Sequence, residues 1–282
     1  MSNKAEKAGI SILPEFGFDP GIDLVLIAKA VGEFDEIHNF FCYGGGIPEP
    51  SAATNSLKYK LCWSFDNMLD ACQRPARIVR EGEIVDIDGK NIFSGENVHE
   101  IDADRHSKFE AYSNGDVTKY LKLIGREKEI KNAARYTLRW PGHAAFWYRI
   151  INLGFLSDTL LEGKDHNISP RKMLYDLLEP QLHYKDNESD MAIIRLELSG
   201  LKDSKKRKVE YQLIEKRDPV SGLLAMQRTV GFTASIGAQM ILDGKITRRG
   251  ILSPIHDVVP DDFIAELAKR NIQIEQRESQ QS

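Results

Sequence analysis

The first 32 residues carry the pattern that most limits what this chain can fold into, because they read as a strand, a tight turn and a helix. Residues 9–14 form a short apolar run that a proline ends, as in a buried strand. Asp19 then suits the cap of a helix and Pro20 its first helical position, and apolar residues recur at helical spacing up to Val31. Such a βα unit needs further parallel strands beside it. We therefore expect the first 30 residues to be the end of an α/β sheet whose earlier strands are absent from this sequence.

A second pattern, the alternation of apolar and polar residues, occurs in residues 191–199 and again in residues 208–216. The charged residues 202–207 link the two runs, so the sequence predicts an antiparallel hairpin. A parallel-type opening unit combined with antiparallel hairpins predicts an α+β fold. The same reasoning predicts strands at 37–43, 76–79, 83–87 and 135–140, and helices at 65–72, 117–124, 141–153, 169–178, 231–243 and 261–269.

Other segments are distinguished by their composition. The glycines at 44–46, followed by Pro48 and Pro50, predict a loop that lets the backbone approach a ligand or that is simply a flexible exit from the strand. Residues 88–107 are polar and have no clear assignment, and the polar residues 273–282 are expected to fray. The helix at 231–243 is expected to pack closely against a partner element through small and apolar residues at helical spacing: Ala234, Ile236, Ala238, Ile241 and Leu242.

Composition excludes several classes of protein. The 282 residues carry a net charge of -4, which gives no basic field for nucleic acid, and the basic run 202–208 is most simply a solvated turn. No apolar run approaches the ~18–20 residues of a membrane span, and no secretory signal is recognised at the N-terminus. The three cysteines and the scattered histidines fit neither a disulfide framework nor a metal site. These features favour a reducing, cytoplasmic setting.

Three polar residues are candidates for chemistry, each with a structural alternative. Asp19 would lie at the carboxyl end of a strand, where open α/β sheets bind ligands, or would be a plain helix cap. Arg139 lies among apolar residues, where a guanidinium holds a substrate carboxylate or pairs with a structural one. His143, near the start of a predicted helix, would transfer protons or make an ordinary hydrogen bond.

Five segments in order resemble the saccharopine dehydrogenase and lysine dehydrogenase family. Residues 17–23 match the family's Gly-hydrophobe-Asp-Pro-Gly-Ile-Asp, and residues 43–50 match an aromatic residue, glycines and Pro-x-Pro. The other similar segments are residues 55–64, residues 137–143 (Thr-Leu-Arg-Trp-Pro-Gly-His) and residues 225–236 (Ala-Met-Gln-Arg-Thr-Val-Gly-Phe-Thr-Ala-Ser-Ile). The resemblance covers nearly the whole chain.

The resemblance implies a domain organisation. Residues 1–36 and 223–282 would be the remnant of a Rossmann-like dinucleotide domain, and residues 37–222 would form the substrate-binding and dimerisation domain. A homodimer is implied by the family alone.

The resemblance also implies a chemistry. Members of this family move a hydride between NAD or NADP and a carbon that bears an amino nitrogen, so an amino-acid substrate is expected. Asp19 and Pro20 would lie near the nicotinamide and the substrate, and Ser64 near the cofactor. Thr137, Leu138 and Arg139 would line the substrate pocket. Asp19 and His143 would be the catalytic residues.

Two departures from the family pattern change these expectations. No GxGxxG motif is present, so cofactor binding is expected to be weak or absent unless an N-terminal Rossmann half is supplied in cis or in trans. Gly115 stands where saccharopine-type members carry an arginine that engages a substrate carboxylate. We therefore expect an oxidoreductase component that acts on lysine or a lysine-derived amino acid. The alternative is a non-catalytic binding or dimerisation module on the same fold.

Overall fold

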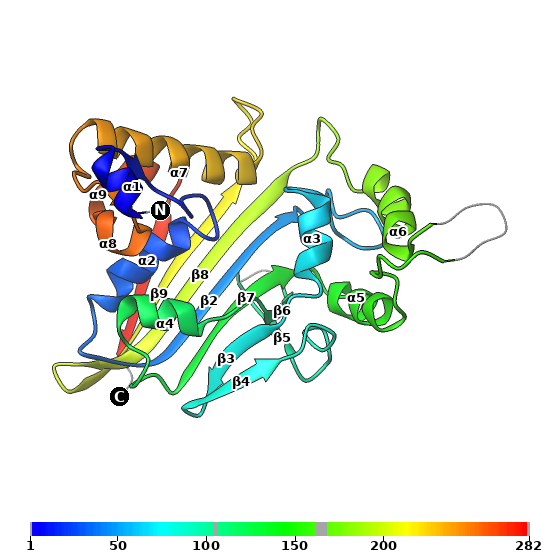
Figure 1. Cartoon of the computed structure of the whole chain (residues 1–282), viewed down its shortest axis with the longest axis horizontal. Coiled ribbons are helices and arrows are strands. Elements are labelled where there is room, and N and C mark those ends of the chain that lie inside the picture. The colour runs from blue at the N-terminus through cyan, green and yellow to red at the C-terminus, as the bar shows by residue number, and fades with distance from the viewer. Residues whose placement is uncertain (1, 104–106, 162–167, 281–282) are drawn as a thin grey trace.

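The centre of the molecule is one large mixed sheet, described in a computed structural model that covers residues 2–103, 107–161 and 168–280 (Figure 1). The strand order in this part of the chain is β11-β9-β8-β2-β7-β3-β4, with β6 paired to β7 and β5 paired to β6. Only β2 and β7 run parallel; the other named neighbours are antiparallel. The strands are β2 (Glu36–Pro48), β3 (Ala76–Arg80), β4 (Glu83–Ile87), β5 (Val98–Ile101), β6 (Phe109–Ser113), β7 (Asn132–Arg139), β8 (Asp190–Lys202), β9 (Lys205–Lys216) and β11 (Ile274–Gln280). The mixed sheet confirms the predicted α+β class.

Helices gather at the two ends of this sheet (Figure 1). Near the N-terminus lie α1 (Ser2–Lys7), α2 (Ile22–Val31), α7 (Ala225–Leu242), α8 (Pro254–Asp257) and α9 (Pro260–Ala268). Toward the other end lie α3 (Phe65–Ala71), α5 (His143–Asn152) and α6 (Pro170–Leu178), whereas α4 (Thr118–Ile124) follows β6. None of the helices in the described residues is long and apolar enough to cross a membrane.

The predicted hairpin is formed by β8 and β9. Alternate side chains of β8 belong to two different core clusters, one on each face of the sheet. Ala192 and Ile194 of β8 face a cluster shared with α2, α7 and α9, whereas Met191 and Ile193 face a separate cluster with β6 and β7. Side chains on a strand point alternately to opposite faces, so an alternating apolar strand in the middle of the sheet serves both layers.

The opening βα unit is present, but its strand does not join the main sheet. β1 (Ser11–Ile12) pairs in parallel with β10 (Gly250–Ile251) in a separate two-stranded sheet. The predicted helix cap is also wrong. Helix α2 begins at Ile22 with Gly21 as its cap residue, and Asp19 and Pro20, joined by a cis peptide bond, precede it.

Two segments predicted to be irregular are strands, so these expectations are wrong. The three glycines 44–46 belong to β2, where they pair with residues 192–194 of β8. Residues 274–280 pair along their length with β9 as an edge strand, although they are almost entirely polar.

Helix α7 packs only in part through the residues predicted: Ile236 is fully buried and Ile241 packs against the core, but the other three do not. Ala234 and Ala238 are exposed, and Leu242 is 84% exposed. The buried face carries Thr233 and Gly237, and a Cβ atom at residue 237 would lie 2.6 Å from the ring of Phe16. The close approach is therefore made at a glycine.

Candidate functional site

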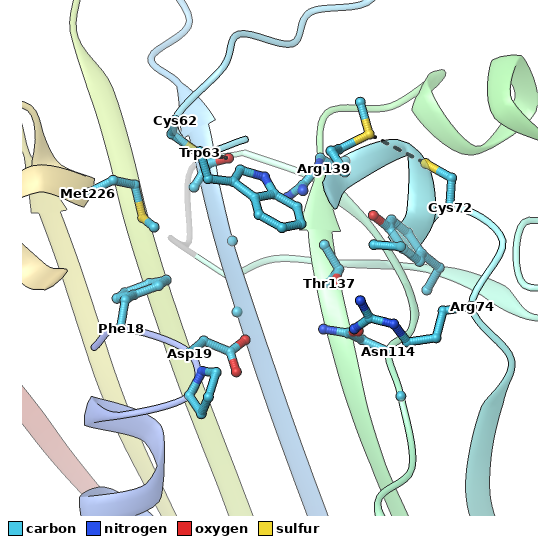
Figure 2. Close-up of a pocket in the computed structure, with 18 of the residues that line it drawn as sticks. Phe18, Asp19, Cys62, Trp63, Cys72, Arg74, Asn114, Thr137, Arg139 and Met226 are labelled. Atoms are coloured by element: carbon cyan, nitrogen blue, oxygen red, sulfur yellow. Dashed lines mark hydrogen bonds between the residues drawn. The ribbon is translucent and has the colours of Figure 1, made fainter. Parts of the chain in front are cut away.

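A cavity of about 380 Å³ lies where the turn before α2, the glycines of β2, the end of β7 and the first residues of α7 meet (Figure 2). Helix α3 and the segment around residue 114 close its remaining side. Its volume lies within the range of about 300–1,000 Å³ that is common for small-molecule sites. The lining includes Asp19, Pro20, Thr137 and Arg139, which are four of the residues implied by the family resemblance.

The glycines 44–46 of β2 line the floor of this cavity. Each lacks a side chain because a neighbour occupies the space. A Cβ atom at Gly45 would lie 2.8 Å from the carbonyl oxygen of Leu138, and one at Gly46 would lie 2.8 Å from Cγ of Met226. At Gly44 the carboxylate of Asp19 fills that place. Groups from neighbouring segments therefore pack directly on the backbone of β2 at this floor.

Asp19 belongs to a buried charge cluster beneath the cavity. The Arg135 guanidinium donates hydrogen bonds to Asp19 and, at 2.7 Å, to Oδ2 of Asp23. The arginine also lies over the ring of Tyr120, 4.2 Å from its centre. Asp23 is fully buried, and burial raises the pKa of its carboxyl to about 7. Arg135 therefore holds two carboxylates in place, of which only Asp19 lines the cavity.

Arg139, the last residue of β7, is a buried cation without a counter-charge. Its side chain donates to the carbonyl oxygen of Leu138 at 2.7 Å and lies 5.2 Å from the centre of the Tyr59 ring. In the described part of the chain, its Nε atom has no hydrogen-bond partner and no carboxylate lies within ion-pair distance. A buried charge is costly unless it is paired, so an anion bound in the cavity would stabilise this arrangement.

Leu138 and Ser64 do not line the cavity in the described structure. The side chain of Leu138 is buried in the cluster with β6 and β8, on the opposite face of β7 from its two neighbours in sequence. The Ser64 hydroxyl caps α3 by accepting a hydrogen bond from the Asn67 N–H at 3.3 Å. The neighbouring Trp63 lies in the lining instead.

His143 lies behind the wall of the cavity rather than in its lining. It is 2% exposed, among the rings of Tyr59, Phe93, Tyr112 and Trp147. Neither ring nitrogen has a hydrogen-bond partner among the described residues. Burial, and secondarily the charge of Arg139, holds the pKa of His143 well below its usual 6.5. This placement gives the predicted proton transfer by His143 no direct route to a molecule in the cavity.

We expect a His143→Phe variant to lose part of the pH dependence of stability. The unfolded chain protonates this histidine below its ordinary pKa of 6.5, but the folded chain does not. The free energy of unfolding of wild type therefore decreases as the pH falls, by about 1.4 kcal/mol at about pH 5.5. Urea unfolding of both proteins between about pH 7.5 and 5.5 should show that the free energy of unfolding falls more for wild type than for the variant. Parallel profiles for wild type and His143→Phe would contradict a neutral His143.

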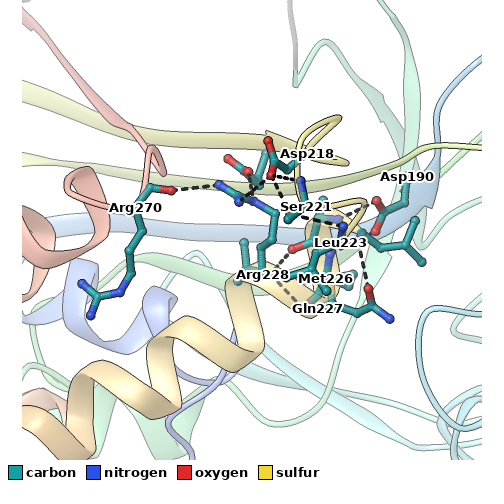
Figure 3. Close-up of polar contacts among 12 residues, drawn as sticks. Asp190, Asp218, Ser221, Leu223, Met226, Gln227, Arg228 and Arg270 are labelled. Atoms are coloured by element: carbon teal, nitrogen blue, oxygen red, sulfur yellow. Dashed lines mark hydrogen bonds and ion pairs between the residues drawn. The ribbon is translucent and has the colours of Figure 1, made fainter.

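The start of α7 is fixed to β8 by a buried carboxylate. Oδ1 of Asp190 accepts from the Ala225 N–H at 2.6 Å, and Oδ2 accepts from the Met226 N–H at 3.0 Å (Figure 3). Farther along the helix, Arg228 pairs with Glu215 of β9 and donates to the carbonyl oxygen of Arg270. These contacts set the positions of Met226 and Val230, which line the cavity.

Sequence reasoning missed several residues of the cavity and its support. Arg74, Trp63 and Met226 line it, and Arg135 supports it from below. The sequence offered one indication for Arg135, because it is a charged residue within a predicted strand. Arg74 carried none, since a single arginine before a proline is typical of an exposed loop.

Comparisons with known proteins agree with this fold. A model of the saccharopine dehydrogenase C-terminal domain matches residues 17–272. The chain is 26% identical to a saccharopine dehydrogenase (NADP+, L-glutamate-forming) of Pyricularia oryzae, over 96% of this chain and 74% of that protein. It is 27% identical to an alpha-aminoadipic semialdehyde synthase of Arabidopsis thaliana, over 90% of this chain but only 31% of that protein.

Solved structures show the same fold. The apo saccharopine dehydrogenase (L-Glu forming) of Saccharomyces cerevisiae superposes with a TM-score of 0.85 at 24% identity, over 97% of this chain and 75% of that one. The homospermidine synthase of Legionella pneumophila is a more distant match, with a TM-score of 0.63 and 10% identity. Because the family model covers nearly all of the sequence, the chain belongs to the saccharopine dehydrogenase C-terminal domain family.

Proposed function

We propose that this chain is the substrate-binding component of an NAD(P)-dependent oxidoreductase that acts on a CH–NH2 or CH–NH group of lysine or a lysine-derived amino acid. The observation that carries this proposal is Arg139, a buried guanidinium in the cavity lining with no carboxylate partner among the described residues. A substrate carboxylate would supply the missing charge through two parallel hydrogen bonds. The names of several relatives, which are saccharopine dehydrogenases, support the reaction class.

Asp19 is proposed to act at the carbon–nitrogen bond. Its carboxylate borders the glycine floor, and Arg135 orients it from the buried side. A carboxylate in this position attracts the positive charge of a protonated amine or of an iminium carbon. With Arg139 holding the carboxylate of the same molecule, the two side chains would fix the orientation of an α-amino acid over the glycines.

The described residues do not fit the pyrophosphate of a dinucleotide at the start of α2, the helix that follows Asp19 and Pro20. The Gly21 N–H donates to Oδ1 of Asp23 at 2.7 Å, and the Ile22 N–H donates to the carbonyl oxygen of Gly17 at 3.1 Å. Backbone groups that are already paired, with a buried carboxylate beside them, leave no anion site. We propose that Asp19, Pro20 and the glycine floor meet only the ring end of NAD(P), which would accept or supply the hydride.

A titration with NADH and NADPH, followed by cofactor fluorescence, tests whether this chain contacts only the ring end of the cofactor. We expect no saturable enhancement with the chain alone at micromolar cofactor. An N-terminal Rossmann half supplied in cis or in trans should restore saturable binding and turnover of a lysine-like substrate. Tight binding of either cofactor to the chain alone would show that the start of α2 does offer an anion site.

Replacing Arg139 by methionine should weaken ligand binding without unfolding the protein. Calorimetry with L-lysine should show at least about tenfold weaker binding, because a charge-assisted pair is lost. Removing an unpaired buried charge should leave the free energy of unfolding within about 1 kcal/mol of wild type or raise it. A large loss of stability would instead mean that Arg139 has a structural role.

Two controls make this experiment specific. Cadaverine, which is lysine without its carboxylate, should bind wild type and Arg139→Met with equal weakness. Arg149→Met, at an exposed arginine of α5, should bind lysine as wild type does. If lysine and other α-amino acids bind wild type no better than cadaverine, the proposed function fails.

A further inference from the structure

A second arginine reaches the cavity from the segment between α3 and β3. Arg74 is exposed, and its guanidinium points toward Asn114 and Thr137 (Figure 2). Within the described ranges its side chain makes no ion pair and no hydrogen bond. Twenty-eight ion pairs occur elsewhere in the same residues, so carboxylates are plentiful away from Arg74. An arginine that lines a cavity and has no partner of its own is available to a ligand.

Backbone hydrogen bonds hold Arg77 of β3, three residues after Arg74, beside residues 115–117. The Arg77 N–H donates to the carbonyl oxygen of Gly115 at 2.9 Å, and the Val117 N–H donates to that of Arg77 at 3.0 Å. Gly115 lines the cavity, and a Cβ atom placed there would meet nothing within 4 Å. The absent side chain at residue 115 therefore leaves an open space next to Arg74, rather than one filled by the core.

The charges around the cavity do not balance. Asp19 is the carboxylate of the lining, and it is already paired with Arg135 from below. Arg139 and Arg74 are then left as two cations without counter-charge among the described residues. In Figure 2 Thr137 is drawn between Arg139 and Arg74. Two separated guanidinium groups in one cavity are complementary to a ligand with two separated carboxylates.

We infer that Arg74 is a specificity-determining residue that binds a second carboxylate of the substrate, while Arg139 binds the first. The inference rests on the proposed function, and it narrows the substrate from lysine-like compounds in general to those that carry a carboxylate at each end. Arginine suits this role because its planar fork binds a carboxylate bidentately and keeps its charge at any physiological pH. Lysine itself would leave Arg74 unpaired and would place its own ammonium group near a cation.

A matched pair of ligands tests the inference. L-2-Aminoadipate and L-norleucine have the same main chain and α-carboxylate, but only the first has a terminal carboxylate. Isothermal calorimetry with the purified chain should show aminoadipate binding roughly tenfold tighter than norleucine. Arg74→Gln should remove this preference by weakening aminoadipate alone, and Arg74→Lys should retain part of it. Arg80→Gln, at an exposed arginine of β3 outside this cavity, should leave the preference unchanged.

The outcomes separate this inference from the proposed function. If both ligands bind wild type equally well and Arg74→Gln changes neither, the role of Arg74 is wrong while the function carried by Arg139 stands. If neither ligand binds, both proposals fail. If Arg74→Gln weakens the two ligands equally, Arg74 acts on the common part of the molecule and does not select the second carboxylate. Circular dichroism of each variant excludes unfolding as the cause.

Discussion

Replacing Arg135 by leucine should cost about 3–5 kcal/mol in the free energy of unfolding, because it leaves buried carboxylates without their cation. Arg135 is 7% exposed and donates to both Asp19 and Asp23. Asp23 has no access to water, so its negative charge would remain uncompensated in the core. Urea unfolding followed by circular dichroism measures the loss.

The size of this loss should depend on pH in a defined direction. Burial already raises the pKa of Asp23 to about 7, and losing Arg135 would raise it further. A carboxyl whose pKa is raised on folding binds its proton more readily in the folded state, so acid relieves the buried charge. The deficit of Arg135→Leu should therefore be smaller at about pH 5 than at about pH 8. Adding Asp23→Asn to the variant should recover stability mainly at the higher pH.

A surface pair provides the control for Arg135. Arg77 pairs with Asp86 at 2.6 Å, but both side chains are well exposed. Arg77→Leu should therefore change the free energy of unfolding by no more than about 1 kcal/mol. If Arg135→Leu costs as little as Arg77→Leu, the cluster beneath the cavity is hydrated, and Arg135 cannot be what orients Asp19.

The elements that sequence predicted well are those whose residues alternate or recur within one segment. The β8–β9 hairpin and the strands β3 and β4 were found because the period of two is local. The α6 start was found because Ser169 caps it, accepting from the Lys172 N–H at 3.1 Å. Local chemistry decides such features, whatever the rest of the fold does.

The glycines of β2 show what composition cannot reveal. Three glycines before a proline are typical of a loop, and the segment is nevertheless a strand in the middle of the sheet. The reason is tertiary, because Asp19, Leu138 and Met226 come from three distant segments to occupy the space of the missing side chains. No window along the sequence contains that information.

The polar C-terminal strand has a different cause. Strand β11 lies at the edge of the sheet and most of its described residues are exposed, so neither of its faces needs a row of apolar side chains. Its backbone pairs with β9, and its charges pair across the two strands, as Arg277 does with Glu210 at 3.1 Å. A strand held by backbone pairing and ion pairs has no hydrophobic pattern to detect.

The candidate site was predicted only in part, and for a comparable reason. Asp19 and Arg139 were candidates from the sequence pattern itself, Thr137 came from the family resemblance, and all three line one cavity. Arg74 and Arg135 were missed because their surroundings are set by contacts between distant segments. A charged residue reveals its role only when its partners, or their absence, are known.

The second large effect is expected at Asp190, which joins β8 to the start of α7. Asp190→Ala should destabilise the protein by about 2–4 kcal/mol, because two backbone N–H groups lose a charged acceptor in a buried place. Leu224, the residue before the helix, has no side-chain acceptor to replace it. Asp190→Asn keeps one carbonyl oxygen and should cost about half as much. Thermal and urea unfolding measure both variants.

Ligand binding distinguishes a local from a general effect of this change. Met226 is one of the two capped residues, Val230 lies about one turn farther along α7, and both line the cavity. A loosened α7 should therefore weaken amino-acid binding even under conditions where Asp190→Asn is fully folded. Asp88→Ala provides the matched control, since Asp88 is exposed, lies outside the cavity and caps a turn by accepting from the Lys90 N–H at 2.8 Å. It should leave both stability and binding near wild type. If the Asp190 variant loses as little stability and binding as the control, packing alone fixes the start of α7. A loss confined to Asp190 would mean that one buried carboxylate couples the main sheet to the wall of the cavity.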